Sequence, residues 1–456
     1  MFGNTISHIE HGDFLSGWKR ICLLSPYNKG WVVENAKDRL PFELSARGLL
    51  LVSSTGGGKS TTMTAVNLLR LTENPCSICC LDPSGDMMRL VAPALRMKGV
   101  DVQVFQPANP AESMKFNKLS DIDPTDRTYI REVAKIIIRS AYAQSSSENQ
   151  FWEDGGVQVI AILIEGICTE LAPERRTLET LYYYLNIFNS RRDEVNQLMM
   201  NLPETSYTEY LGIVSAEPKM LNSFLSTCKV ALQLMGSQDV REVTSETTFD
   251  ISDMRRRSTC LFLVVEEFQL KTFAFLTTLL MHSVMKCLMQ HKSPDLSPYL
   301  HQFLIWDEFA NAMTYNEMIP SFLSTCRKKG ICTLIMLQSE EQIFQHYSRT
   351  EGQIILDNLN TQIYYPGVMN VDTLKRIQTL LGTNAKQKFS WWSGFDEQKE
   401  KPQEKPLMSL EAIRTMKPNN GLLITSNLPP ALISPRPFFK SYWCKQQIKR
   451  GNRRGL

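Results

Sequence analysis

Residues 49–61 constrain the fold of this chain more than any other stretch of its sequence. Four apolar residues, Leu-Leu-Leu-Val, are followed by Ser-Ser-Thr-Gly-Gly-Gly-Lys-Ser-Thr, and an apolar pattern with helical spacing begins directly afterwards. A strand, a glycine-rich turn and a helix in this order form a phosphate-binding loop, in which backbone N–H groups and the helix N-terminus face phosphate oxygens. The stretch therefore predicts a nucleotide-binding α/β domain.

The residues of this loop have distinct expected roles, with ATP and Mg²⁺ as the cofactors. We expect Lys59 to reach the terminal phosphates and the Ser60 hydroxyl to bind Mg²⁺. Ser53 stands where the motif usually has glycine, which is tolerable if φ stays negative at that position. The residues expected to bind the nucleotide are Ser54, Thr55, Gly56, Gly57, Gly58, Lys59, Ser60 and Thr61.

Two later strands end in residues that would complete such a site. Residues 303–306 are apolar and run into Asp307 and Glu308. We expect Asp307 to bind the Mg²⁺ hydration shell and Glu308 to polarise the attacking water. The apolar run 331–337 ends in Gln338, which either senses the γ-phosphate through that water or only caps the next helix. An apolar strand that ends in Asp-Glu is common by itself, but it is specific when Gly-Lys-Ser-Thr lies upstream.

Another predicted strand, residues 75–81, ends in the acidic turn that begins at Asp82. Ligands in open parallel sheets lie beyond the carboxyl ends of strands, so this turn should lie near the nucleotide. Asp82 would hold a water on Mg²⁺ or orient a neighbouring loop; the alternative is an ordinary solvated turn.

The order of the predicted elements indicates an α/β protein with a mostly parallel sheet and a helical insertion. Strands and helices alternate up to residue 105, whereas nearly everything between residues 151 and 236 has helical spacing. We divide the chain into an N-terminal lead-in segment (1–40), a first nucleotide-binding part (41–145), an inserted all-α domain (146–245), a second nucleotide-binding part (246–440) and a basic C-terminal tail (441–456).

The amino-acid composition excludes few classes of function. The chain has 50 basic and 47 acidic residues and a net charge of +3, which is too balanced to argue for nucleic-acid binding from charge alone. The longest apolar stretch, residues 273–289, is interrupted by polar side chains and predicts a buried helix, not a membrane span. The eleven cysteines are scattered, and most are expected to be small apolar fillers in a reducing cytoplasm.

Two segments leave their interpretation open. The basic tail most often would be disordered and solvated, but contact with anionic lipid or nucleic acid is the alternative; its cations include Lys445, Lys449, Arg450, Arg453 and Arg454. Residues 387–406 are typical of a mobile loop. Within them, Trp391 and Trp392 would stack on single-stranded bases or pack onto a neighbouring surface.

The ordered set of motifs resembles the type IV secretion system coupling proteins, the TraG/TraD-type conjugation ATPases. It consists of Ser-Thr-Gly-Gly-Gly-Lys-Ser, Leu-Asp-Pro-Ser-Gly-Asp, the helical insertion, Trp-Asp-Glu-Phe-Ala-Asn, Cys-Arg-Lys-Lys-Gly and Leu-Gln-Ser. The resemblance implies a RecA-like P-loop motor domain with an inserted all-α domain, in a homo-hexamer with ATP sites between subunits. By position, Arg327 matches the arginine that such rings supply to the neighbour's γ-phosphate; an ordinary surface arginine is the alternative.

The same resemblance implies a function and partners. The chain would be an ATPase, a motor that recruits relaxase-bound DNA to a type IV secretion channel and drives conjugative DNA transfer. Its partners would be single-stranded or double-stranded DNA, the relaxase, the ATPases of the secretion system and a membrane-anchoring partner. Two alternatives remain: a substrate-receptor and assembly platform that uses nucleotide as a switch, or a related hexameric DNA-translocating ATPase.

One departure from the resemblance affects the expected location. Most relatives carry transmembrane helices before the motor domain, whereas some forty polar residues precede it here. We therefore expect a soluble form that lacks the N-terminal transmembrane anchor, or a chain shortened at that end. The expected location is cytoplasmic and peripheral at the inner face of the cell membrane.

Overall fold

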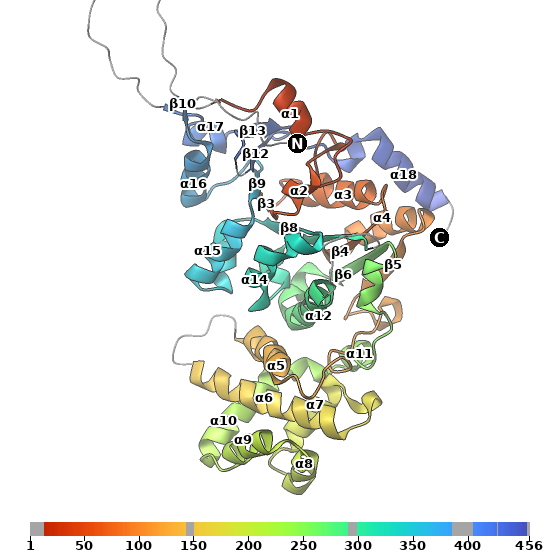
Figure 1. Ribbon diagram of the computed structural model, residues 1–456, viewed down its shortest axis with the longest axis vertical. Helices are drawn as coiled ribbons and strands as arrows, with labels where there is room; N and C mark the ends of the chain where they lie inside the picture. Colours follow the sequence, from red (N-terminus) through yellow and green to blue (C-terminus); the bar gives the residue numbers. More distant parts are fainter. Residues whose placement is uncertain (1–12, 143–149, 291–298, 385–404, 426, 454–456) are drawn as a thin grey trace, which may run out of the picture.

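The computed structural model describes residues 13–142, 150–290, 299–384, 405–425 and 427–453. An α/β part built on one sheet and a block of helices follow each other along the longest axis of the molecule (Figure 1). The predicted boundary at residues 145 and 146 lies outside the described residues, as do Trp391, Trp392 and Arg454.

The sheet is mostly parallel, as predicted. Its strand order is β13-β12-β9-β3-β8-β7-β4-β6-β5. All neighbours from β9 to β5 run parallel, whereas β12 is antiparallel to both β9 and β13. The strands are β3 (Leu49–Val52), β4 (Cys76–Pro83), β5 (Asp101–Phe105), β6 (Thr259–Val265), β7 (His301–Trp306), β8 (Ile331–Leu337), β9 (Thr361–Tyr364), β12 (Gly421–Thr425) and β13 (Ala431–Ile433).

Register brings the important strand ends together. Val52 pairs with Leu337 across β3 and β8, and Trp306 pairs with Ile335 across β7 and β8. Because the three strands are parallel, their carboxyl ends meet at one edge of the sheet, where ligands bind in folds of this kind.

Helices cover both faces of the sheet, which explains why strands β3, β6 and β8 are buried along their whole length. Helices on the side of the chain termini are α1 (Gly17–Leu23), α2 (Phe42–Ser45), α3 (Ala65–Leu71), α4 (Asp86–Met97) and α18 (Tyr442–Arg453). Those toward the helical block are α12 (Leu270–Gln290), α13 (Phe309–Ala312), α14 (Met318–Thr325) and α15 (Arg349–Asn358).

Smaller elements complete the α/β part. Strands β1 (Val32–Glu34) and β2 (Asp38–Arg39) form a hairpin beside α3, and β10 (Thr383–Asn384) pairs with β11 (Lys405–Pro406). Helices α16 (Val371–Leu381) and α17 (Leu410–Arg414) lie near that second pair, and α11 (Gln238–Val243) connects back from the helical block.

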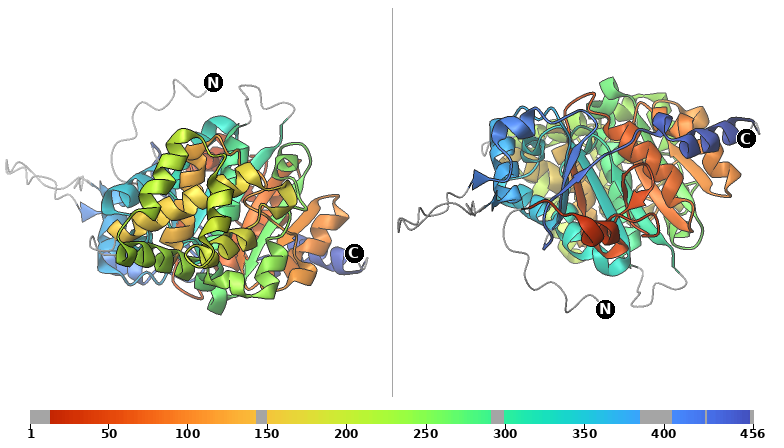
Figure 2. Two further views of the ribbon diagram at one scale, coloured as in Figure 1. Left: turned by 90° about the horizontal axis from the view of Figure 1, so that it is seen from below. Right: turned by 90° about the horizontal axis from the view of Figure 1, so that it is seen from above.

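The helical block is the expected insertion. Its helices are α6 (Gln150–Glu170), α7 (Leu178–Ile187), α8 (Arg192–Met199), α9 (Glu204–Val214) and α10 (Pro218–Ala231), seen from below in the left view of Figure 2. Helix α5 (Arg127–Ala141) packs on α6 and also on α12. This helix, which the sequence places in the first nucleotide-binding part, therefore joins the insertion to the α/β part.

Helix α12 has the length and apolar composition of a membrane span. Residues 267–290 form the one such segment in the described part of the chain, but 78% of its most apolar window is buried inside the protein. The predicted burial of residues 273–289 is thus confirmed for its apolar positions, and its hydropathy reflects core packing.

The expected basic tail differs from the structure, because residues 442–453 form helix α18. The Trp443 ring lies over the Arg70 guanidinium, 3.6 Å from its Cζ to the ring centroid. A Cβ built on Gly451 would lie 2.5 Å from the Ala94 nitrogen of α4, so only glycine permits this approach. Cys444, Ile448 and Gly451 recur at helical spacing, which is typical of a helix with one buried face. The many cations of the segment nevertheless favoured the prediction of a solvated tail.

We expect Gly451→Ala to destabilise the protein and release α18, because the added methyl group meets backbone atoms that have no room to shift. The cost should be about 1–3 kcal/mol. Denaturant unfolding would measure the stability, and hydrogen exchange of the α18 amides would measure its docking. Gly212→Ala is the matched control: its site in α9 has nothing within 4 Å of an added Cβ. There the same change should stabilise by about 0.5–1 kcal/mol. Equal effects at both sites would contradict close docking of α18.

Candidate nucleotide-binding site

The phosphate-loop sequence leaves β3 and turns back through two glycines. The Ser53 N–H donates to the Leu337 carbonyl at 3.0 Å, which fixes the start of the loop to β8. Gly56 and Gly58 have φ of 74° and 82°, in the left-handed region that favours glycine. Ser53 does not have a positive φ, which meets the condition for a serine there. Its Oγ lies 2.1 Å from where a Cβ on Gly57 would stand, so this serine requires glycine at position 57.

Lys59 contacts both the phosphate loop and the end of β7. Its buried Nζ donates to the Ser53 carbonyl at 2.9 Å and lies 3.6 Å from Glu308 Oε1. The cation is thus placed between the loop backbone and a carboxylate at the end of β7, where phosphate oxygens would replace the Ser53 carbonyl as its partner.

Ser60 and Asp307, the two residues expected to bind magnesium, are hydrogen-bonded to each other. Ser60 Oγ donates to Asp307 Oδ2 at 2.7 Å, and Thr64 Oγ1 donates to the same oxygen at 3.3 Å. Asp307 is buried, and burial raises the pKa of its carboxyl above the usual value. A bound cation would favour the charged form of this carboxyl.

This donor set fits Mg²⁺ with nucleotide and does not fit a metal held by protein alone. The described residues contain no group of three or more His, Cys, Asp or Glu that could hold a metal ion. Mg²⁺ usually keeps several waters and is bound through one or two carboxylates together with substrate phosphates. One carboxylate and one hydroxyl beside a glycine-rich turn match that pattern.

Glu308 stands in a strained position. Its φ of 52° is left-handed, which costs a non-glycine residue of order 1–3 kcal/mol. Gln338 Nε2 lies 3.2 Å from both of its carboxylate oxygens, and Gln338 Oε1 accepts from Thr55 Oγ1 at 3.1 Å. The Gln338 amide thus connects the phosphate loop to the Glu308 carboxylate.

The alternative role for Gln338, capping the next helical segment, belongs to its neighbour. Ser339 is the N-cap of the 3₁₀ turn Glu340–Gln345, and Gln342 completes a capping box with it. The Gln338 side chain instead faces Glu308 and Thr55.

Asp82 is buried at the end of β4, which rules out the alternative of an ordinary solvated turn for this carboxylate. Its Oδ2 accepts from the Met88 N–H at 2.6 Å and so fixes the first turn of α4. Burial raises the pKa of the Asp82 carboxyl to about 7, with the Asp307 charge adding to the shift. The contact orients the start of α4, whereas the two predicted roles, holding a water on Mg²⁺ and orienting a neighbouring loop, stay predictions.

Arg327 lies apart from the other predicted site residues. Arg327 is exposed and belongs to the 3₁₀ turn Cys326–Lys329, immediately before β8, whereas the phosphate loop lies beyond the other end of that strand. The length of β8 separates the two edges by roughly 20 Å. The Arg327 side chain has no hydrogen-bond or ion-pair partner among the described residues.

One residue of the site was not predicted from the sequence. Thr64, which donates to Asp307, stands one helical turn after Ser60.

Comparison with known proteins identifies the family. Residues 13–452 match the family model described as type IV secretory system conjugative DNA transfer. The chain is similar to VirD4 of Agrobacterium fabrum, with 24% identity over 395 residues that cover 84% of this chain and 57% of VirD4. VirD4 of Rhizobium rhizogenes is 23% identical over the same coverage, so the chain spans little more than half the length of these relatives.

Solved structures show the same fold. The bacterial conjugative coupling protein TrwBdeltaN70 in complex with sulfate superposes with a TM-score of 0.72 and 15% identity, over 95% of this chain and 96% of the TrwBdeltaN70 chain. TrwB in complex with ADP and Mg²⁺ gives 0.70 and 16% over 94% of each chain. The predicted RecA-like fold is therefore confirmed. Since the family model matches nearly the whole chain and the motifs lie together in this fold, the chain belongs to the type IV secretion coupling proteins of conjugative DNA transfer.

Proposed function

We propose that this chain is an ATP-hydrolysing motor that recruits relaxase-bound DNA to a type IV secretion channel and drives its transfer. The observation that carries the proposal is the convergence of Lys59, the Ser60–Asp307 pair and the Gln338–Glu308 pair at one sheet edge. Solved structures of TrwB hold a non-hydrolysable ATP analogue in one case and ADP with Mg²⁺ in another, which supports nucleotide chemistry at this position.

The residues divide the reaction among them. Lys59 would exchange the Ser53 carbonyl for phosphate oxygens, and Ser60 and Asp307 would hold Mg²⁺ with a hydroxyl and a carboxylate. Bound Mg²⁺ supplies neutralisation of phosphate charge. Glu308 polarises the attacking water, and Gln338, which already contacts Glu308 and Thr55, orients that water toward the γ-phosphate.

Arg327 supports a shared site between subunits. Arg327 is exposed at the sheet edge opposite to Lys59 and has no ion-pair partner among the described residues, which supports a role at the nucleotide of a neighbouring copy. We propose a homo-hexameric ring in which Arg327 of one copy stabilises the charge that develops at the next copy's γ-phosphate.

The proposed location is cytoplasmic and peripheral at the inner face of the membrane. There the chain would work with the secretion ATPases and an anchoring partner. An assembly platform that uses nucleotide only as a switch is the second candidate, and stimulation of turnover by DNA separates the two.

Lys59→Ala should reduce ATP hydrolysis to background, because the variant loses the cation that lies against the loop backbone at Ser53. Glu308→Gln keeps the side-chain shape and should retain nucleotide binding while turnover falls at least about 100-fold. Phosphate release measures turnover, and fluorescence of a labelled nucleotide measures binding. Unchanged hydrolysis by Lys59→Ala would contradict the assignment of this site to ATP hydrolysis.

A mixture of Lys59→Ala and Arg327→Ala subunits should recover part of the activity that each lacks alone. An Arg327→Ala copy has an intact phosphate loop and receives its arginine from a Lys59→Ala neighbour. Lys328→Ala, the adjacent exposed lysine, is the matched control and should remain active by itself. Light scattering confirms that mixed oligomers form. No recovery in such oligomers would mean that Arg327 does not act across the interface.

Single-stranded DNA should raise the ATPase rate of a sample sized by light scattering. A motor couples hydrolysis to substrate, whereas a platform would bind ATP and show the same rate with and without DNA. A duplex of the same sequence tests which form the motor grips, and heparin controls for a general polyanion effect. A monomer indifferent to all three would contradict the motor.

A further inference from the structure

Positive charge is concentrated at the C-terminal end of the chain. The last acidic residue is Glu411, and residues 412–456 hold nine lysines and arginines without a single Asp or Glu. The whole chain carries a net charge of only +3, so the part before residue 412 is net negative. This asymmetry indicates a local surface for an anionic partner.

Helix α18 presents these cations as a stripe. Lys445, Lys449 and Arg453 stand at i, i+4 and i+8, and Arg450 lies beside them; all four are exposed. None has an ion-pair partner among the described residues. Like charges at this spacing repel one another, so the stripe weakens the helix unless something outside supplies negative charge.

An apolar patch lies near the other terminus. Trp18 and Ile21, one turn apart on α1, are 77% and 59% exposed, and Tyr27 in the following loop is 91% exposed. Lys19 and Lys29 flank them and are exposed too. Tryptophan and tyrosine with neighbouring lysines are the residues enriched where proteins meet the headgroup region of a membrane.

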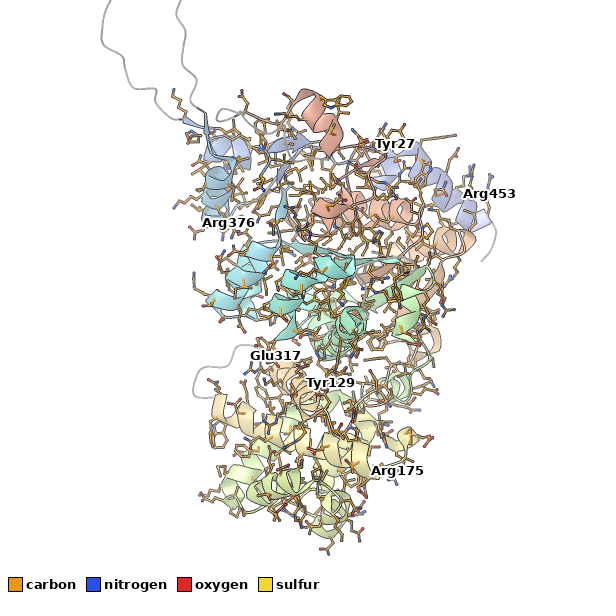
Figure 3. The ribbon with its side chains drawn as sticks, viewed as in Figure 1. Tyr27, Tyr129, Arg175, Glu317, Arg376 and Arg453 are labelled. Carbon is orange, nitrogen blue, oxygen red and sulfur yellow. The ribbon has the colours of Figure 1, made fainter. Side chains whose placement is uncertain are left out.

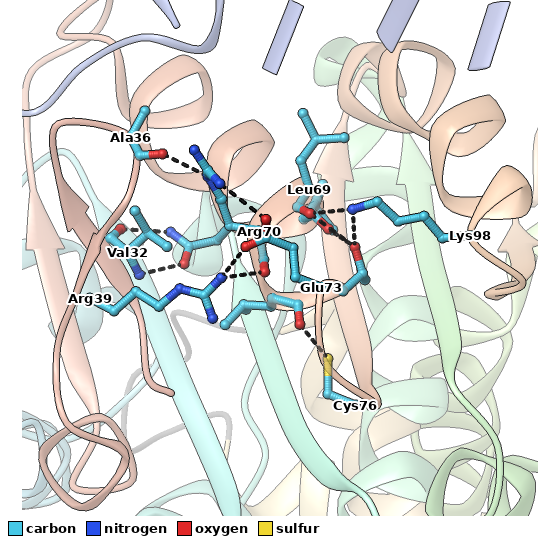
Figure 4. Close-up of polar contacts among 12 residues, drawn as sticks. Val32, Ala36, Arg39, Leu69, Arg70, Glu73, Cys76 and Lys98 are labelled. Atoms are coloured by element: carbon cyan, nitrogen blue, oxygen red, sulfur yellow. Dashed lines mark hydrogen bonds and ion pairs between the residues drawn. The ribbon is translucent and has the colours of Figure 1, made fainter. Parts of the chain in front are cut away.

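Both features belong to one end of the molecule. The view from above in Figure 2 shows α1 and α18 uncovered, and Figure 3 places Tyr27 and Arg453 at the end opposite to Arg175 of the helical block. Figure 4 shows polar contacts that Arg70 of α3 makes with the N-terminal segment. Arg70 Nε donates to the Ala36 carbonyl at 2.9 Å. The same guanidinium stacks on the Trp443 ring of α18.

The N-terminal segment is tied to the same helix. Arg39 Nη2 donates to the Arg70 carbonyl at 2.7 Å, and Asn67 exchanges two hydrogen bonds with Val32. Arg20 of α1 pairs with buried Glu34 at 2.7 Å and donates to the Leu432 carbonyl at 3.0 Å. The segment that carries the apolar patch and the helix that carries the cation stripe therefore both contact α3.

We infer that this end of the molecule binds anionic lipid headgroups, with the α18 stripe facing the phosphates and Trp18, Ile21 and Tyr27 entering the interface. A nucleic acid would use the cations but gives no partner for an exposed isoleucine, whereas a membrane surface accounts for both. The inference rests on the proposed peripheral location and is independent of nucleotide hydrolysis.

Co-sedimentation of the full chain with vesicles tests the inference. The chain should pellet with phosphatidylcholine vesicles that contain about 30% phosphatidylglycerol and not with phosphatidylcholine alone, and raised salt should release it. Replacing Lys445, Lys449, Arg450 and Arg453 with glutamine should lower the partition coefficient on the order of 100-fold. The matched control removes four exposed cations elsewhere, at Arg175, Lys219, Lys229 and Lys375, and should bind like the wild type.

A second variant and two further readouts keep the outcomes distinct. Trp18→Ser with Ile21→Ser should weaken vesicle binding on the order of 10-fold, and this loss should depend little on salt. ATP turnover should be unchanged in all of these variants, and Lys59→Ala should still bind vesicles, so that failure of the proposed motor is seen separately. Equal loss in the four-cation control overturns the inference. So does a wild type that ignores vesicles while a labelled oligonucleotide binds through the α18 cations.

Discussion

The pairing of β3 with β8 is the interaction on which the site depends. β3 carries the phosphate loop, β8 carries Gln338, and β8 in turn pairs with β7, which carries Asp307 and Glu308. A slip of one residue between β3 and β8 would displace Gln338 by about 3.3 Å and turn its side chain to the other face of the sheet. The hydrogen bonds of Gln338 to Thr55 and Glu308 would be lost together.

Much of this arrangement is readable from the sequence, because parallel strands covered on both faces are continuous apolar runs that end in a turn. The runs at residues 49–52 and 331–337 match β3 and β8 residue for residue. Once the strands are known, their polar end residues must share an edge. Two features of the site depend on tertiary geometry and are not predicted by any local sequence pattern. They are the left-handed conformation of Glu308 and the second hydrogen bond to Asp307, from Thr64.

Sequence reasoning failed where a segment's partner lies far along the chain. Helix α18 is stabilised by Arg70 and by the backbone at Ala94, hundreds of residues away, so its own composition suggested a solvated tail. For Asp82 the local sequence left a solvated turn open as an alternative, and only the packing of β4 between β6 and β7 shows that its carboxyl is buried. In both cases local polarity was a poor guide, because tertiary contacts override it.

If Arg327 acts at a neighbour's nucleotide as proposed, each copy of the chain has two unlike ends: the candidate nucleotide site at one edge of the sheet and Arg327 at the other. Contacts that join such ends are head-to-tail, so they cannot be satisfied by a two-fold dimer. An open row of copies always leaves one site without its arginine and one arginine without a site. A closed ring leaves neither, so ring closure itself would make the last site competent, and partly assembled rings would hydrolyse less per subunit than complete ones.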